Sequence, residues 1–162
     1  MTTKKIEFSN LKDHKYNFYS QNGEDGVIQE INKRLDLDNK SASRWCVEFG
    51  AWDGIFLSNT FKLVKEGWNC IYIEGDKEKY KDLEKTKINY PKIVSINKFI
   101  SKEKKSPNSL DNILCKTKIP KDFEILSIDI DSFDLEVWES FTLYMPKIVI
   151  IEIYKRISAW HY

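Results

Sequence analysis

Short apolar runs alternate with amphipathic segments along most of this chain. Five runs are nearly continuous in apolar residues and have the length of buried strands; they cover residues 44–49, 70–74, 93–96, 123–130 and 147–153. Helical periodicity is found in the segments around them, at residues 20–35, 55–68, 76–86, from 107 onward and 135–141. Strands that alternate with helices predict an α/β fold with a doubly wound, mainly parallel sheet and helices on both faces.

The length of 162 residues suits one domain with a substantial core. Residues 1–18 are expected to form a loosely held N-terminal arm, and residues 19–162 a single Rossmann-like domain. Lysine and arginine number 26 against 25 aspartates and glutamates, so the net charge of +1 predicts no nucleic-acid binding.

The sequence contains no apolar stretch of membrane-spanning length, and no apolar run follows the N-terminal residues as a secretion signal would require. Three cysteines, Cys46, Cys70 and Cys115, show no paired metal-binding spacing. An odd number of cysteines without a secretion signal favours reduced, buried thiols. We therefore expect a cytoplasmic protein that has no membrane partner.

A glycine loop follows the first predicted strand, with Gly50 and Gly54 in the segment Glu48–Gly54. Strand, glycine loop and helix together form the first half of a nucleotide-type binding site. The dinucleotide fingerprint needs a glycine where this loop has Trp52, which argues against a pyrophosphate. Twenty residues after Gly54, the second strand ends at Glu74, where an acidic residue binds ribose hydroxyls. A ribose without a pyrophosphate suggests S-adenosylmethionine.

Three further segments allow two interpretations each. The first helical turn near Ser58 and Asn59 has free N–H groups that can hold a carboxylate, or Ser58 is a plain N-cap. Asn97, at the end of the third strand, contacts a base or simply ends the strand. The glycine-rich turn at residues 21–26 is approached closely by another group, or it is an ordinary acidic helix start.

Carboxylates follow the fourth and fifth predicted strands, and buried charge needs a partner or a ligand. Asp129 and Asp131 share one face of the fourth strand, and Glu152 ends the next strand. One of these carboxylates can serve as a general base, or the set can hold a hard cation such as Mg²⁺. Asp131 or Asp134 can instead cap the helix that follows. We favour a functional role for Asp129 and a capping role for Asp134; base and metal ligand stay open.

Five segments, in this order, resemble S-adenosylmethionine-dependent methyltransferases of the FkbM-like type. They are Tyr19–Asp25, Glu48–Gly54, Tyr72–Asp76, Ser127–Asp131 and Lys147–Ile153, so the resemblance covers roughly residues 19–153. It implies a Rossmann-like S-adenosylmethionine-binding domain that methylates a hydroxyl group of a sugar or another small metabolite.

The resemblance also implies roles for individual residues. Glu48, Gly50 and Gly54 would shape the loop under the methionine part, Glu74 would bind the ribose, and Asn97 would lie near the adenine. Gln21 and Glu24 would close the cofactor pocket, and Asp129, with Asp131, would serve catalysis. The expected cofactor-binding set is completed by Ala51, Trp52, Asp53, Ser58 and Asn59, and the expected metal ligands are Asp129, Asp131 and Glu152.

The sequence departs from the FkbM-like pattern in two places. Trp52 replaces an asparagine that is frequent in the glycine loop, and the fold normally continues past the fifth strand with a helix and a strand pair. Without that pair the sheet would have an exposed edge, so we expect a homo-oligomer. The alternative functions are a truncated protein that binds S-adenosylmethionine or S-adenosylhomocysteine without catalysis, and a lyase or hydrolase that consumes the same cofactor.

Overall fold

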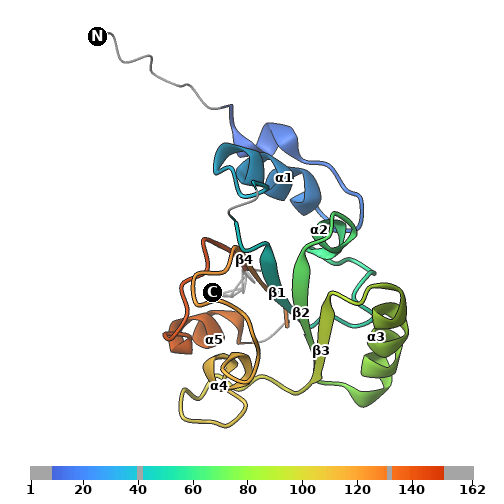
Figure 1. Ribbon diagram of the computed structural model, residues 1–162. Coiled ribbons are helices and arrows are strands. Elements are labelled where there is room, and N and C mark those ends of the chain that lie inside the picture. Colours follow the sequence, from blue (N-terminus) through green and yellow to red (C-terminus); the bar gives the residue numbers. More distant parts are fainter. Residues whose placement is uncertain (1–8, 40–41, 131–132, 152–162) are drawn as a thin grey trace, which may run out of the picture.

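Figure 1 shows the computed structural model of the chain, which describes residues 9–39, 42–130 and 133–151. Five strands form one parallel sheet in the order β3-β2-β1-β4-β5. The strands are β1 (Trp45–Phe49), β2 (Asn69–Glu74), β3 (Ile93–Asn97), β4 (Ile125–Ile128) and β5 (Ile148–Ile151). The predicted α/β fold with a doubly wound parallel sheet is confirmed, and the strand order reverses between β1 and β4.

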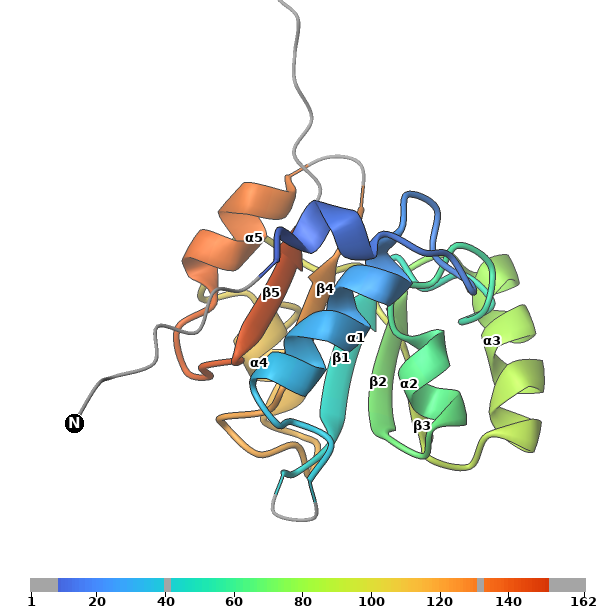
Figure 2. The same ribbon diagram turned by 90° about the horizontal axis from the view of Figure 1, so that it is seen from above.

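Helices cover both faces of this sheet (Figures 1 and 2). The helices are α1 (Glu24–Arg34), α2 (Phe61–Lys65), α3 (Lys77–Asn89), α4 (Leu110–Leu114) and α5 (Asp134–Ser140). Side chains alternate between the two faces because the strand period is two. Val47 and Phe49 pack with residues of α4 and α5, while Cys46 packs with residues of α1, α2 and α3.

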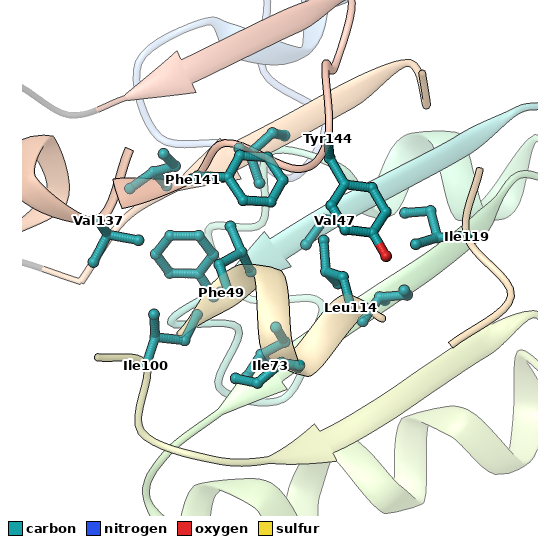
Figure 3. Close-up of a cluster of buried hydrophobic side chains, with 14 of the residues drawn as sticks. Val47, Phe49, Ile73, Ile100, Leu114, Ile119, Val137, Phe141 and Tyr144 are labelled. Carbon is teal, nitrogen blue, oxygen red and sulfur yellow. The ribbon is translucent and has the colours of Figure 1, made fainter. Parts of the chain in front are cut away.

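The core on the α4 and α5 face is the larger cluster of buried side chains. Figure 3 shows Phe49 and Ile73 of the central strands beside Leu114 of α4 and Val137 of α5. The ring of Phe141 stacks on that of Tyr144, with their centroids 5.6 Å apart. Burial of this apolar surface is the main force that holds the two helices on the sheet.

Several elements are shorter than predicted. The helix expected at residues 55–68 is only Phe61–Lys65, and the strand expected at 123–130 is only Ile125–Ile128. α1 begins after Gly23, whose φ is 98°, so Ser20 is not its N-cap as predicted. α4 begins after Ser109, which caps it through the N–H of Asn112, rather than at Pro107.

The glycine-rich segment at residues 21–26, which includes the first residues of α1, is packed against the chain's own N-terminal segment. The short 3₁₀ helix η1 (Leu11–His14) lies beside α1, and the N–H of Gly26 donates to the carbonyl of Tyr16 at 2.9 Å. A Cβ atom at Gly26 would lie 2.1 Å from the carbonyl oxygen of His14. A close approach to this turn was one of the two interpretations, and the approaching group is the backbone of residues 14–16.

Cys46 and Cys70 are buried and pair in register on β1 and β2, but Cys115 is exposed. The prediction that all three thiols are buried is therefore wrong for Cys115, because this residue follows the last turn of α4 on its outer side. In the described ranges, no helix is both long enough and apolar enough to span a membrane. The expectations for Asp131 and Glu152 lie outside the described residues, and the homo-oligomer stays a prediction.

Candidate functional site

A cleft of about 350 Å³ opens at the carboxyl ends of β1, β2 and β4. We call it the β1–β2 cleft; its walls are Phe49, Gly50, Ile73, Glu74, Gly75, Lys79, Lys98, Phe99, Ile100, Asp129, Ile130 and Phe133. Ligands of open parallel sheets bind outside the carboxyl ends of the strands, at the point where the strand order reverses. The cleft occupies that position because β1 pairs with β2 on one side and with β4 on the other.

Glu74 ends β2 and lines this cleft, as predicted from its place in the sequence. Its side chain is held from two sides, because Oε2 accepts the N–H of Trp52 at 2.8 Å and Oε1 accepts that of Asp76 at 2.7 Å. A carboxylate has about four acceptor positions, so each oxygen can accept one more hydrogen bond. Glu74 is thus a fixed carboxylate that can bind two neighbouring hydroxyl groups.

Gly50 lets the loop after β1 approach the chain after β4. Its φ is 76°, its N–H donates to the carbonyl of Ile73 at 3.1 Å, and a Cβ there would lie 1.9 Å from the carbonyl oxygen of Asp129. Only glycine satisfies both the left-handed backbone and this contact. Gly50 therefore lets the loop after β1 contact the chain after β4 at the wall of the β1–β2 cleft.

A pair of glycine variants tests that contact. Gly67 also has a positive φ, 87°, but only the flexible end of Lys92 lies near its missing Cβ. Gly67→Ala should reduce the free energy of unfolding by about 1 kcal/mol, the cost of a left-handed alanine. Gly50→Ala should cost at least about twice as much because it adds the clash with Asp129. Equal losses in urea unfolding would show that the close approach is unimportant.

The carboxylate of Glu48 binds the segment that leads into α2, and Glu48 does not line the β1–β2 cleft. Its carboxylate accepts the hydroxyl of Ser58 at 2.9 Å and that of Thr60 at 2.5 Å, together with the N–H groups of Asn59 at 3.2 Å and Thr60 at 3.0 Å. Burial raises the pKa of Glu48, and the bonds from Thr60, Ser58 and Asn59 oppose that rise. The N–H groups at this helix start were predicted to hold a carboxylate, and the carboxylate that they hold is the side chain of Glu48.

Ser58 acts as more than a simple cap. Its hydroxyl oxygen accepts the N–H of Phe61 at 3.0 Å while the same hydroxyl donates to Glu48. The N-cap position of α2 belongs to Thr60, which has no side-chain cap bond there. Ser58 thus joins the start of α2 to β1, and neither Ser58 nor Glu48 lines the cleft.

The remaining residues of the glycine loop shape it in different ways. Ala51 is buried, and Asp53 accepts the N–H groups of Ile55 and Phe56, both at 2.8 Å. Trp52 is 42% exposed and packs edge-on against Phe56, outside the walls of the cleft. Its indole ring therefore does not fill the space that a ligand would need.

Asn97 is occupied by the backbone of β2, and its neighbour Phe99 faces the cleft instead. The side-chain amide of Asn97 donates to the carbonyl of Glu74 at 2.8 Å and to that of Gly75 at 3.2 Å. Phe99 is 72% exposed, and its ring lies so close to Gly75 that a Cβ there would be 2.2 Å away. The ring of Phe99 is thus an aromatic surface beside Glu74. No role was predicted for Phe99 from the sequence.

Two exposed phenylalanines offer a matched test of this surface. Phe99→Ala should weaken the binding of a planar ligand that stacks on this ring by roughly fivefold, since stacking on an aromatic ring contributes about 1 kcal/mol. Phe56→Ala removes an aromatic ring that follows the glycine loop and does not line the cleft, and should leave the dissociation constant unchanged. Equal effects of the two variants in calorimetry would exclude a specific role for Phe99.

A second cavity of about 260 Å³ lies on the other side of Asp129, and we call it the α1–β5 cavity. Its walls are Gln21, Asn22, Glu24, Leu57, Asn59, Ile128, Asp129, Ile150 and Ile151. Glu24 and Asp129 are the acidic groups of these walls, and no described wall residue is basic. Asp129 borders both spaces.

The turn before α1 is positioned by Asp25. One oxygen of its carboxylate accepts the N–H groups of Phe18 at 2.8 Å, Tyr19 at 2.7 Å and Ser20 at 2.8 Å. In return, the hydroxyl of Ser20 accepts the N–H of Asp25 at 3.0 Å. This exchange fixes the turn that follows, and Gln21 and Glu24 line the α1–β5 cavity. Their role in closing a cofactor pocket stays a prediction.

Asp129 is the one described residue of the proposed metal set, and it is exposed at the end of β4. Within the described ranges, no group of three histidine, cysteine, aspartate or glutamate residues could hold a metal ion. Asp134 is the first residue of α5 and accepts the N–H of Ile130 at 2.8 Å; the N-cap position belongs to Phe133. The predicted cap at Asp134 is therefore wrong, because its carboxylate binds the loop after β4.

The fold and the cleft together define a Rossmann-like α/β protein with a cleft at the carboxyl edge of its parallel sheet, where ligands of such sheets bind. No protein-family model matches the chain, and no curated protein matches it. A Rossmann-like fold is compatible with many activities, so the geometry of the site has to indicate the function.

Proposed function

We propose that this protein is an S-adenosylmethionine-dependent methyltransferase of the FkbM-like type that acts on a hydroxyl group of a sugar or small metabolite. The observation that carries the proposal is Glu74, a fixed carboxylate with free acceptor positions at the end of β2, beside the glycine loop. A carboxylate in that position binds the ribose diol of a nucleoside.

Three features of the site fit this cofactor. The β1–β2 cleft offers Phe99 and Ile100 as apolar surfaces for the base beside Glu74 for the sugar. The α1–β5 cavity offers Glu24 to an ammonium group and the amides of Gln21 and Asn22 to a carboxylate. Acidic walls also favour a sulfonium group over a pyrophosphate because opposite charges attract. When bound, the cofactor would supply an electrophilic methyl group.

The described residues would place the acceptor and receive its proton. Asp129 borders both cavities, so its carboxylate is in position to serve as the general base for an acceptor hydroxyl. Gly50 keeps the chain after β4 close to the glycine loop, which brings Asp129 to the junction. Alignment of the hydroxyl with the methyl group would lower the barrier because the reacting atoms are held in the geometry of attack. A role for Mg²⁺ at Asp129 and Asp131 stays an open alternative.

Two lysines favour a second candidate ligand. Lys79 and Lys98 line the β1–β2 cleft, and no ion pair joins either to a described residue. The ammonium group of Lys79 lies 4.8 Å from the ring centre of Trp52. Cations near Glu74 would suit a phosphate on the nucleoside, so the alternative is a protein that binds an adenine nucleotide.

Incubation with S-adenosylmethionine, followed by mass spectrometry, separates the candidates. We expect S-adenosylhomocysteine to accumulate only when a hydroxyl acceptor is present. Product without acceptor would instead indicate a lyase or hydrolase, and binding without turnover a non-catalytic protein. Adenosine 5′-monophosphate that binds at least tenfold more tightly than S-adenosylmethionine would favour the nucleotide alternative.

A further inference from the structure

Lysines gather in the segment that joins β3 to α4, at residues 98–109, and we call this segment the β3–α4 loop. Figure 1 shows it running from the end of β3 to α4. It contains Lys98, Lys102, Lys104 and Lys105 but only one acidic residue, Glu103, so its net charge is +3. The whole chain carries +1, so the residues outside this loop have a net charge of −2. The β3–α4 loop is therefore a basic segment on an otherwise slightly acidic chain.

The β3–α4 loop borders the β1–β2 cleft. Its first three residues, 98–100, are walls of the cleft. The ammonium group of Lys102 lies 5.7 Å from the ring centre of Phe133, which lines the same cleft together with Asp129. The Cα atom of Lys104 is at most about 7.6 Å from that of Lys102, because consecutive Cα atoms are about 3.8 Å apart. This separation is within the Debye length of about 8 Å in physiological salt, so the two charges act together on a ligand.

Hydrogen bonds hold the backbone of the loop in place. The N–H of Ser101 donates to the carbonyl of Asn108 at 3.0 Å, and the N–H of Ser106 donates to that of Glu103 at 2.9 Å. The side-chain amide of Asn112, on α4, donates to the carbonyl of Ser106 at 2.8 Å. The lysine side chains of the loop are exposed, and they extend from a backbone that is fixed at both ends.

Most of these positive charges are not neutralised by the chain itself. No ion pair joins Lys98, Lys104 or Lys105 to a described residue. Lys102 has one such contact, at 3.9 Å from Glu136, and both side chains are about half exposed. A surface pair of this kind contributes little energy, so Lys102 can exchange it for a ligand. Cations that lie close together without carboxylate partners attract an anionic group.

We propose that the acceptor of the methyl transfer is an anionic sugar or small metabolite, and that the lysines of the β3–α4 loop bind its phosphate or carboxylate group. This inference rests on the proposed function and names the class of acceptor for the same cleft. Lys102 would hold the anionic group beside Phe133. A long polyanion such as a nucleic acid is disfavoured, because the net charge of −2 outside the loop repels a ligand that extends beyond it.

Calorimetry with matched sugars tests the charge of the acceptor. The probes are glucose 6-phosphate and glucuronate, which carry a phosphate and a carboxylate, and neutral glucose as their control. We expect at least one anionic probe to bind at least tenfold more tightly than glucose, and the tighter of the two identifies the anionic group. Its affinity should fall when the salt concentration rises from about 0.01 M to about 0.15 M, because the Debye length shrinks from about 30 Å to about 8 Å.

Two triple variants with the same change in net charge locate the site. The combination of Lys102→Gln, Lys104→Gln and Lys105→Gln should weaken the binding of the tighter anionic probe at least tenfold. The matched control replaces, also by glutamine, three exposed lysines of the connection between α4 and β4, namely Lys116, Lys118 and Lys121. These lysines do not line the β1–β2 cleft, so the control should bind the probe as wild type does.

The proposal is overturned if neither anionic probe binds more tightly than glucose, or if the two triple variants have equal effects. A single-stranded oligonucleotide that binds more tightly than both anionic probes would also overturn it. Each titration is repeated with saturating S-adenosylhomocysteine, and competition with the probe would contradict the proposal by placing the anion in the nucleoside site. If S-adenosylhomocysteine itself does not bind, the proposed function fails, while the titrations with probe alone still decide whether the loop binds an anion.

Discussion

Glu74→Ala is expected to weaken the binding of S-adenosylmethionine by about 10- to 100-fold. In the proposed complex, Glu74 accepts two charge-assisted hydrogen bonds from the ribose, each of which contributes about 1.5–3 kcal/mol before the loss of water contacts is counted, and the variant removes both. It also releases the N–H groups of Trp52 and Asp76 from the carboxylate. Isothermal titration calorimetry of purified wild type and variant measures the change.

Two variants separate ribose binding from the support of the glycine loop. Glu74→Gln keeps one acceptor oxygen and nearly the same shape, so it should lie between wild type and Glu74→Ala. Glu78→Ala removes an exposed carboxylate of α3 that pairs with Lys81, and it should bind the cofactor as tightly as wild type. Unchanged affinity in Glu74→Ala would falsify the placement of the ribose.

Glu124→Ala is expected to lower the free energy of unfolding by about 4 kcal/mol, the largest stability loss we foresee. Glu124 is fully buried at the amino edge of the sheet, where its carboxylate accepts the N–H groups of Ser43 at 3.0 Å and Trp45 at 2.8 Å. It also pairs with Lys147 at 2.9 Å, just before β5. Removal leaves two backbone N–H groups without partners, at about 1–3 kcal/mol each.

The stability that Glu124 contributes should depend on pH. Burial alone would raise the pKa of Glu124, but the bonds from Ser43, Trp45 and Lys147 outweigh it and lower the pKa below its ordinary value of 4.5. A lowered pKa stabilises the fold above pH 4.5, and this contribution is lost as the pH falls through the folded-state pKa. The difference in the free energy of unfolding between wild type and Glu124→Gln should therefore decrease as the pH is lowered.

The matched control for the stability loss is Glu136→Ala. Glu136 is half exposed on α5 and lies 3.9 Å from Lys102, a surface pair of little energetic value. Urea unfolding should change by less than about 0.5 kcal/mol. A similarly small change in Glu124→Ala would show that the two N–H groups find other partners.

The parallel sheet could be predicted because its strands are largely apolar on both faces, as in Cys70–Ile73 and Ile148–Ile151. The short α2 could not, because local bonds compete with the helix that the pattern indicates. Asp53 binds the N–H groups of Ile55 and Phe56, and Leu57 has a φ of 56°. Side chains that bind nearby N–H groups stop a helix without changing its hydrophobic period.

The sequence predicted the position of a side chain best where that residue lies directly at the end of a strand. Glu74, Gly50 and Asp129 follow directly from the ends of their strands, and all three line the β1–β2 cleft. Glu48 and Asn97 were assigned to the ligand, but each binds backbone of its own chain. Sequence spacing gives the place of such a side chain but not its partner, since the partner lies on another element.

The central claim is that a nucleoside with a sulfonium tail lies across Asp129 with its sugar on Glu74. A crystal structure of the protein grown with saturating S-adenosylhomocysteine tests this most directly. The account predicts both ribose hydroxyls within hydrogen-bond distance of the Glu74 carboxylate and the adenine beside Phe99. A nucleoside bound elsewhere, or a β1–β2 cleft that stays free of ligand at saturation, would contradict it.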